Sequence, residues 1–300
     1  MPVIIPNDLP SKKWLEQERI FFMDKDRAAS QDIRPLKAAV VNLMPTKEET
    51  ERQFLRLLSI TPLQIDMCFL HMNTHKSKTT DMSHMKKFYK TPSEIMKDKF
   101  DLLIITGAPV ETLDFPKVDY WIELCGLMAW AKSNVYCTVF VCWGAQAGLF
   151  FNYGVPKYAE PKKVFGVYEH QIMDRKSPLF WGFDDTIFIP HSRHTGIKTA
   201  DVAKNGELKV EALSSEAGAG IISARGGREI YITGHLEYDV DTLDREYKRD
   251  LSKGLEISKP KNYYKNDIPQ STWRTDASLF YTNLINMVYQ GTPFDLEEIQ

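Results

Sequence analysis

Short apolar runs alternate with helical patterns through the first half of the chain, and this alternation restricts the fold more than any other feature. The apolar runs are Leu36–Met44, Leu63–Met72, Phe100–Pro109 and Val139–Val141. Each run is short enough for a buried strand, and the segments between them carry apolar residues at helical spacing. Strands that are joined by helices form a parallel sheet with helices on both faces. The sequence therefore predicts an α/β fold with a mostly parallel open sheet flanked by helices.

Two helix starts in this half carry their own signals. Residues 46–49, Thr-Lys-Glu-Glu, fit a capping box, in which the threonine and the last glutamate each cap a backbone N–H of the first turn. Pro116 opens a second helix, because proline suits the first helical turn. We expect the core face of that helix to contain Val118, Trp121, Ile122, Cys125, Leu127 and Met128.

The second half of the chain predicts strands in close succession. The expected strands are Thr186–Ile197, Leu208–Ser215, Ala219–Gly227 and Arg228–Tyr238. Residues 225–228, Arg-Gly-Gly-Arg, predict a hairpin turn between the last two. Helices are expected around Asp244–Leu255 and from Asp276 onward, and Gly291 and Pro293 end the second of these.

We expect a single domain with an N-terminal extension over residues 1–34, an α/β core over 35–250 and a C-terminal helical segment over 251–300. The polar stretch His75–Thr91 predicts a surface loop over one edge of the fold. Its cluster at Met82–Met85 leaves a soft-metal site as a weaker alternative.

Composition excludes several classes of protein. The 300 residues carry a net charge of -2 and show no basic stripe for nucleic acid. No apolar stretch approaches the roughly 20 residues of a membrane helix, and the N-terminus lacks the apolar core of a signal peptide. Four cysteines are too few for a disulfide scaffold. We therefore expect a cytoplasmic protein that binds neither nucleic acid nor membrane.

One cysteine, Cys142, lies between an apolar run and a segment rich in small residues, Trp143–Leu149. This pattern predicts a tight strand-to-helix turn, at the sheet edge where open α/β sheets bind ligands. Unpaired N–H groups and the helix dipole favour a thiolate there, which is the reactive form of cysteine. The N–H of Trp143 would point at an oxyanion. The alternative is a buried core cysteine, the role expected for Cys68, Cys125 and Cys137.

A candidate base and its partner occur in the sequence Thr-Gly-His-Leu-Glu-Tyr. His235 and Glu237 are two residues apart, and in an extended backbone such residues point the same way. The carboxylate would then fix the tautomer of the imidazole and stabilise its charged form. The combination of a corner cysteine with this pair favours nucleophilic catalysis over a structural role for Cys142.

The motifs CWGAQAG and HLE resemble the Cys–His–Glu arrangement of class I glutamine-amidotransferase-like domains. Together with VNLMPTKEETERQFLRLL, PLQID, TGAPVETLDF, PHSRHT and TGHLEYD, they resemble the homoserine O-acyltransferase family, which acts in methionine biosynthesis. The resemblance covers nearly the whole chain. It implies a glutamine-amidotransferase-like or flavodoxin-like sheet, transfer of an acyl group from coenzyme A to L-homoserine, and a homodimer.

The resemblance also assigns roles to residues. Cys142 would accept the acyl group, His235 would deprotonate the homoserine hydroxyl and Glu237 would orient His235. Backbone N–H groups of Trp143 and of the Gly107–Ala108 loop would form the oxyanion hole. No permanently bound cofactor or metal is implied, because acetyl-CoA is a co-substrate.

By the same resemblance, the amino-acid acceptor would be held by Arg249, Ser192 and Lys163, with Arg249 on its carboxylate. The nearest rival bases are His191 and His194, which share a strand end with Ser192. They would also need a third ligand to hold a metal. Lys47 lies beyond the first strand, on the edge of the sheet where the ligand is expected, and would help to anchor a ligand.

The acyl group is indicated by Glu111. In the family that the chain resembles, glutamate at this position accompanies acetyl-specific members, and a small residue accompanies succinyl-specific ones. A succinyl group ends in a carboxylate, and two like charges about 4 Å apart repel by roughly 1 kcal/mol in water and about 4 kcal/mol at intermediate dielectric. We therefore expect acetyl-CoA. A homoserine O-succinyltransferase is the alternative, followed by a glutamine amidotransferase, a thiol peptidase and a binding module without chemistry.

Overall fold

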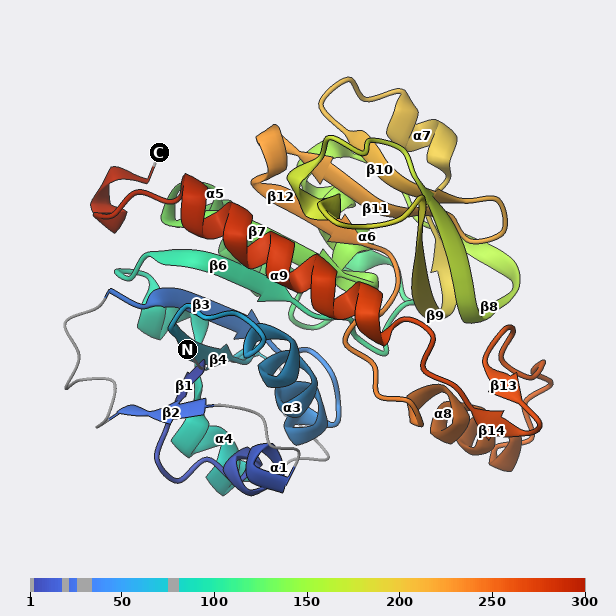
Figure 1. Cartoon of the computed structure of the whole chain (residues 1–300), viewed down its shortest axis with the longest axis horizontal. Coiled ribbons are helices and arrows are strands. Elements are labelled where there is room, and N and C mark those ends of the chain that lie inside the picture. The colour runs from blue at the N-terminus through green and yellow to red at the C-terminus, as the bar shows by residue number, and fades with distance from the viewer. Residues whose placement is uncertain (1–2, 18–21, 26–33, 75–80, 300) are drawn as a thin grey trace.

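The structure is a computed structural model that describes residues 3–17, 22–25, 34–74 and 81–299. A 12-stranded mixed sheet runs through it, and β13 and β14 form a separate two-stranded ribbon (Figure 1). The strands are β1 Val3–Ile5, β2 Phe22–Asp24, β3 Leu36–Val41, β4 Ile65–Leu70, β5 Tyr89–Lys90, β6 Phe100–Ile105, β7 Val135–Val141, β8 Tyr158–Ile172, β9 Thr186–Gly196, β10 Lys209–Ser214, β11 Gly218–Ala224, β12 Glu229–Ile232, β13 Tyr264–Lys265 and β14 Ile268–Pro269.

The sheet has a parallel part and an antiparallel part. Its strand order is β2-β1-β4-β3-β6-β7-β12-β11-β10-β8-β9, with β5 beside β4. From β2 to β12 all neighbours are parallel, and from β12 to β9 all neighbours are antiparallel. The predicted change of pattern between the two halves of the chain is thereby confirmed. The hairpin at residues 225–228 joins β11 to β12.

Helices cover both faces of the parallel part. In Figure 1, α3 and α9 cross the front of the sheet, and α5 and α6 lie behind it. Two separate apolar cores correspond to these layers, one containing Phe54 and Phe280 and the other containing Leu127 and Leu149. The helices are α1 Ser11–Gln17, α3 Lys47–Leu58, α4 Met82–Phe88, α5 Trp121–Asn134, α6 Trp143–Tyr153, α7 Thr199–Ala203, α8 Thr242–Ser252 and α9 Arg274–Gly291. The predicted α/β class is confirmed.

The capping box predicted at residues 46–49 is wrong. Thr46 is the N-cap of α3, but its side chain accepts no hydrogen bond from the helix. Glu49 does not reach back to Thr46, because its carboxylate binds the guanidinium of Arg245 on α8. A tertiary ion pair has replaced the local cap.

The helix predicted from Pro116 begins later than expected. Phe115–Lys117 form a 3₁₀ turn, and α5 starts at Trp121. The buried face of α5 includes Leu124 and Ala131, while Ile122 is 86% exposed. Ile122 was therefore wrongly placed in the core.

The stretch predicted as a surface loop contains a helix and a short strand in its described part. Asp81 caps α4 by accepting a hydrogen bond from the Ser83 N–H. His84 and Met85 are buried, and His84 Nε2 lies 2.9 Å from Glu51 Oε1 on α3. Residues 75–80 of the predicted loop lie outside the described residues.

Two strands at the sheet margins were not predicted. β8 is 15 residues long and pairs with β9 and β10, and its first half is largely exposed. β1 pairs with β4, so residues from the N-terminal segment extend the sheet. The division of the chain at residues 34 and 250 stays a prediction. Among the described helices, none combines the length and the apolar character that a membrane span requires.

Candidate active site

Three neighbouring parallel strands end at one edge of the sheet and bring the predicted residues together. β7 pairs with β6 on one side and with β12 on the other, in parallel register. Gly107 follows β6, Cys142 follows β7 and His235 follows β12. Carboxyl ends of adjacent parallel strands are where open α/β sheets place ligands.

Cys142 occupies the sharp turn that the sequence predicted. Its φ of 51° and ψ of -113° are rare for a residue with a side chain, and such strain costs of order 1–3 kcal/mol. The Cys142 N–H donates to Ile232 O at 2.7 Å, which ties the turn to β12. The residue is 8% exposed and lines a cavity, so it is neither on the open surface nor sealed in the core.

Gly107 lies directly against Cys142 and His235. A Cβ atom added at Gly107 would be 3.3 Å from both Cys142 Cβ and His235 Cε1. The absence of a side chain therefore lets the backbone of Gly107 approach both residues closely. Trp143 supplies the first N–H of α6, which has no carbonyl partner within the helix.

His235 and Glu237 form a buried pair. His235 Nδ1–H donates to Glu237 Oε1 at 2.6 Å, and the two side chains are 3% and 5% exposed. The ring also lies close enough to the Cys142 sulfur for the charge of a thiolate to act on it. Burial disfavours the charged ring, but the charges of Cys142 and Glu237 outweigh it and raise the pKa of His235 well above its usual value.

His235 and Glu237 do not lie in the extended strand from which their proximity was predicted. β12 ends at Ile232, so His235 and Glu237 lie in the turns that follow and not in an extended strand. Their approach depends on tertiary contacts. The His235 N–H donates to Pro190 O at 2.8 Å, and Arg56 Nη2 donates to Glu237 O at 2.6 Å.

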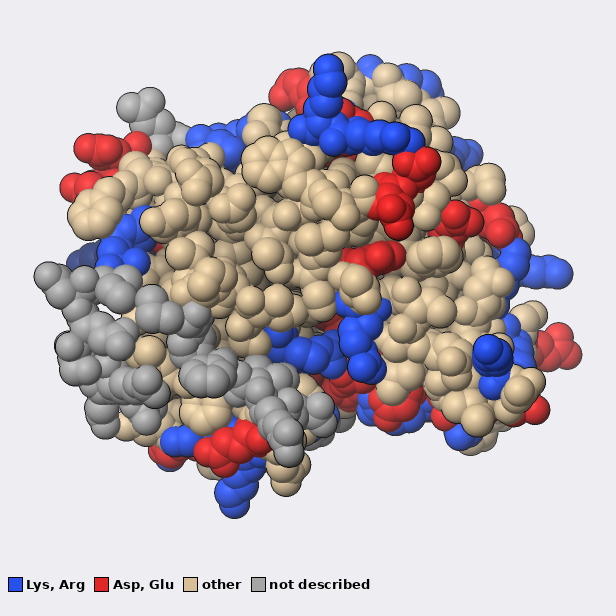
Figure 2. All heavy atoms as spheres, viewed as in Figure 1, with Lys and Arg blue, Asp and Glu red and all other residues tan. Residues whose placement is uncertain are grey.

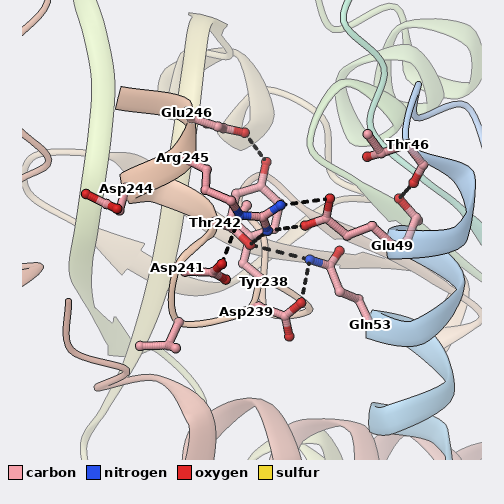
Figure 3. Close-up of polar contacts among 12 residues, drawn as sticks. Thr46, Glu49, Gln53, Tyr238, Asp239, Asp241, Thr242, Asp244, Arg245 and Glu246 are labelled. Carbon is pink, nitrogen blue, oxygen red and sulfur yellow. Dashed lines mark hydrogen bonds and ion pairs between the residues drawn. The ribbon is translucent and has the colours of Figure 1, made fainter. Parts of the chain in front are cut away.

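Tyr238 packs against one face of the His235 imidazole. Its ring stacks on His235 with centroids 4.1 Å apart and planes 13° apart. The Tyr238 hydroxyl donates to Glu246 Oε1 at 3.1 Å, as Figure 3 shows. Glu246 Oε2 is buried without a hydrogen-bond partner among the described residues. Glu246 is therefore an acid with one oxygen available to a ligand.

A cavity of about 280 Å³ joins nearly all the predicted site residues. Glu237 does not line it, because it lies behind His235. Sequence reasoning missed further lining residues, notably Tyr238, Glu246 and Asp250. The predicted residues that line the cavity are Gly107, Ala108, Glu111, Cys142, Trp143, Lys163, Ser192, His194, His235 and Arg249.

The two predicted cationic residues meet on one buried carboxylate. Asp250 Oδ2 accepts from Lys163 Nζ at 2.9 Å, and Asp250 Oδ1 accepts from Arg249 Nε at 2.8 Å. Asp250 is 4% exposed. Burial alone would raise the pKa of Asp250, but Lys163 and Arg249 hold it below its usual value. The only sequence signal for Asp250 was its position next to Arg249.

Glu111 is fixed against β9. Its Oε2 accepts hydrogen bonds from the His194 N–H at 2.8 Å and from the Thr195 N–H at 3.2 Å. The carboxylate therefore occupies one position in the cavity wall.

The rival candidates lie in other environments. His191 is fully buried and stacks on His170, and burial lowers its pKa well below the usual value. His194 is exposed at the cavity rim. Lys47 is buried, donates to Asn42 O and does not line the cavity that contains Cys142. Among the described residues, no group of three His, Cys, Asp or Glu side chains could hold a metal ion.

The sequence matches the homoserine O-succinyltransferase family over residues 2–294. The chain belongs to this family. Two relatives are similar along their whole length. A protein from Clostridium acetobutylicum named homoserine O-acetyltransferase is 52% identical over 301 residues, which is 99% of this chain and 100% of the relative. A protein of the same name from Lachnospira eligens is 53% identical over 303 residues, which is 99% of this chain and 98% of the relative.

Solved structures support the fold. A glutamine amidotransferase from Thermotoga maritima superimposes with a TM-score of 0.56 at 9% identity, covering 86% of this chain and all of the other. At this identity the similarity concerns the fold alone. The predicted glutamine-amidotransferase-like architecture and the predicted family are both confirmed.

Proposed function

We propose that the protein is a homoserine O-acetyltransferase that uses Cys142, His235 and Glu237 to move acetyl from acetyl-CoA to L-homoserine. The observation that carries this proposal is the cavity that a strained corner cysteine shares with a histidine backed by a buried glutamate. Family membership supports the acceptor and the class of reaction. The names of the relatives support acetyl as the acyl group.

The first half-reaction forms an acyl-enzyme. His235 takes the proton of the Cys142 thiol, and the thiolate attacks the thioester carbonyl of acetyl-CoA. The N–H groups of Trp143 and of Gly107 or Ala108 stabilise the oxyanion; one such donor is worth about 100-fold in rate. The C–S bond of the donor breaks, and the coenzyme A sulfur leaves with a proton from His235.

The second half-reaction repeats the proton movements on the acceptor. His235 takes the proton of the homoserine hydroxyl, and the oxygen attacks the acetyl-cysteine carbonyl. The thioester to Cys142 breaks, and O-acetyl-L-homoserine is released with the free enzyme. Glu237 holds the proton on His235 Nδ1, so that the other ring nitrogen does the transfer. The cycle balances without a permanently bound cofactor or metal.

The acceptor brings one negative and one positive group into the cavity. Arg249 carries a planar guanidinium that suits the homoserine carboxylate. Glu246 lines the same cavity and has a buried oxygen without a partner among the described residues, which suits the ammonium. Ser192 lines the same cavity, and Lys163 lies beside Arg249 on the shared carboxylate of Asp250. These two residues complete the acceptor site that we propose.

Glu111 supports acetyl over succinyl. Its carboxylate lines the cavity beside Cys142 and is fixed by backbone N–H groups of β9. A succinyl carboxylate would meet a like charge that cannot move away. An acetyl group has no such charge and needs less space.

The test is incubation with L-homoserine and acetyl-CoA, with succinyl-CoA and glutamine in parallel. We expect O-acetylhomoserine as the main product, and no product with Cys142→Ser. Ammonia release from glutamine without acyl transfer would show that the protein is an amidotransferase and that the proposal is wrong.

We further propose that the enzyme acts in the cytoplasm as a homodimer.

Glu111→Gly tests the acyl choice. We expect the ratio of kcat/KM for acetyl-CoA to that for succinyl-CoA to fall at least about tenfold, which corresponds to about 1.4 kcal/mol of removed repulsion. Exposed Glu207→Gly serves as a control for the loss of one acid. An unchanged ratio in Glu111→Gly would mean that this carboxylate does not select the acyl group.

A further inference from the structure

A second and larger cavity lies beside the catalytic one and carries excess positive charge. It measures about 470 Å³, within the range of roughly 300–1,000 Å³ that small-molecule sites occupy. Its walls come from α3, the segment 236–241 and the start of α9. Figure 2 shows basic side chains gathered between α3 and the N-terminal end of α9. The charged residues that line this arginine cavity are Arg52, Arg56, Arg245, Arg274, Asp239 and Asp241.

Its two acids are already paired with two of its arginines. Arg56 binds Asp239, and Arg245 Nε lies 3.0 Å from Asp241 Oδ2. Within the described ranges, Arg52 and Arg274 form ion pairs with no carboxylate. These two arginines leave the cavity with uncompensated positive charge.

The Arg52 guanidinium is held in a fixed position, but the described residues supply no hydrogen-bond acceptor for its Nε. Its guanidinium lies 5.5 Å from the ring centroid of Trp14, an arrangement that holds the side chain in place. Its Nε is buried and has no hydrogen-bond partner among the described residues. A buried donor without an acceptor is unfavourable, so an anion in the cavity would stabilise this arrangement.

The arginine cavity and the site of Cys142 are neighbours that share a lining residue. Tyr238 lines both cavities and stacks on His235. A third cavity of about 310 Å³ lies between them, and it shares Glu246 with the catalytic cavity and Arg245 with the arginine cavity. Figure 3 shows Glu246 and Arg245 on successive positions of α8, with Arg245 reaching to Glu49 on α3. The cavities form a row that leads from the sulfur to the arginines.

We propose that the arginine cavity binds the phosphate groups of the coenzyme A donor. This inference rests on the proposed acetyl transfer. Coenzyme A carries its phosphates and adenine at the end opposite the thioester, and the arm between them is uncharged. The guanidinium fork matches phosphate oxygens, and Trp14 offers an aromatic surface for the base. A free nucleotide has the same chemistry, so the experiment must separate the two.

The test measures binding by calorimetry and needs no turnover. Wild type, the double variant Arg52→Gln with Arg274→Gln, and a control Arg175→Gln are titrated with coenzyme A and with pantetheine, which lacks the phosphates. Arg175 forms an exposed pair with Asp185 outside the cavity. We expect wild type and the control to bind coenzyme A at least about tenfold more tightly than pantetheine, because each lost phosphate contact costs about that factor. The double variant should lose this preference and keep its affinity for pantetheine.

Three results would overturn the inference: equal binding of the two ligands by wild type, full affinity for coenzyme A in the double variant, or an equal loss for both ligands. ADP is titrated as well. If the double variant loses ADP binding but keeps the preference for coenzyme A, the cavity serves a free nucleotide and the donor assignment is wrong. The Lys variants Arg52→Lys and Arg274→Lys should restore most of the preference. If wild type fails to transfer acetyl yet prefers coenzyme A through these arginines, the proposed function fails and the site stands.

Discussion

The His235 imidazole is bounded by four groups, each with a separate effect. Glu237 accepts a hydrogen bond from its Nδ1–H, and the charge of Cys142 acts on the ring. Tyr238 covers one ring face, and Gly107 lies against the ring edge. The negative groups raise its pKa, so the ring keeps its proton above the usual pH range when Cys142 is a thiolate. The sulfur and the ring therefore act as one unit, and removing either alone removes most of the function.

The raised pKa of His235 predicts how Cys142 reacts with iodoacetamide. In wild type we expect rapid alkylation at pH 7, because charged His235 stabilises a thiolate beside it. His235→Asn removes the positive charge, so alkylation should become at least about tenfold slower at pH 7 and recover at higher pH. The rate is measured against pH by mass spectrometry, with Cys125→Ser as the control for a cysteine on a helix. Identical profiles in wild type and His235→Asn would contradict the coupling.

We expect substitution of Asp250 to weaken homoserine binding more than it slows the chemical step. Asp250→Asn leaves Lys163 and Arg249 without their shared negative charge, so both side chains should move. We expect the KM for homoserine to rise about tenfold while kcat changes less, and Asp250→Glu to recover part of the loss. Steady-state kinetics decide this, with Asp267→Asn as the control because Asp267 forms an exposed pair with Lys259. A fall in kcat alone would assign Asp250 a different role.

At the scale of elements, α6 must start directly against the end of β6. Gly144 lies in its first turn, and a Cβ there would be 2.7 Å from the carbonyl oxygens of both Ile105 and Thr106. Contacts this short cannot be relieved without moving backbone. The position of Cys142 therefore depends on a glycine that faces the neighbouring strand.

Gly144→Ala tests this dependence. In a free helix alanine is favoured over glycine by about 1 kcal/mol, but the clash should instead destabilise the protein by about 1–3 kcal/mol and reduce acetyl transfer. Gly126→Ala on α5 is the matched control, since a Cβ there meets nothing within 4 Å and should stabilise or leave the protein unchanged. Denaturant unfolding and turnover measure both. Equal stability of the two variants would refute the packing argument.

The elements that sequence reasoning missed share a physical cause. The strands that end at Ile105 and Val141 were predictable because their residues are buried and apolar throughout. β8 was missed because polar and charged residues fill its exposed half. The helix at Met82–Phe88 was missed because the polar contact that its buried His84 makes is with Glu51, 33 residues away. Local patterns cannot show contacts of this kind.

The site residues also differ in whether a local sequence pattern could reveal them. Cys142 was predictable because the small residues of its corner are consecutive in sequence. The two-residue spacing of His235 and Glu237 indicated the pair, although the two residues follow the end of β12 and do not lie in an extended strand. Glu246 had no local signal, because its contact is with Tyr238, and Asp250 had only its position next to Arg249, because its other partner is Lys163 on β8.

For the whole molecule, the two halves of the sheet contribute different parts of the site. The parallel part supplies Gly107, Cys142 and His235, and the antiparallel part with α8 supplies Lys163, Ser192 and Arg249. The acyl-accepting sulfur therefore belongs to one part, and the proposed acceptor groups belong mainly to the other. Because His235 lines the same cavity as the sulfur and the proposed acceptor groups, the same histidine can serve both half-reactions.

Mass spectrometry of the protein mixed with acetyl-CoA alone shows whether Cys142 carries the acetyl group between the two half-reactions. After rapid acid quenching we expect one acetyl group on Cys142, which disappears on addition of homoserine as O-acetylhomoserine forms. Cys68→Ala should behave as wild type, and Cys142→Ala should take up no acetyl group. If product forms with both substrates but no acetyl-Cys142 is detected with acetyl-CoA alone, the acyl-enzyme account is wrong.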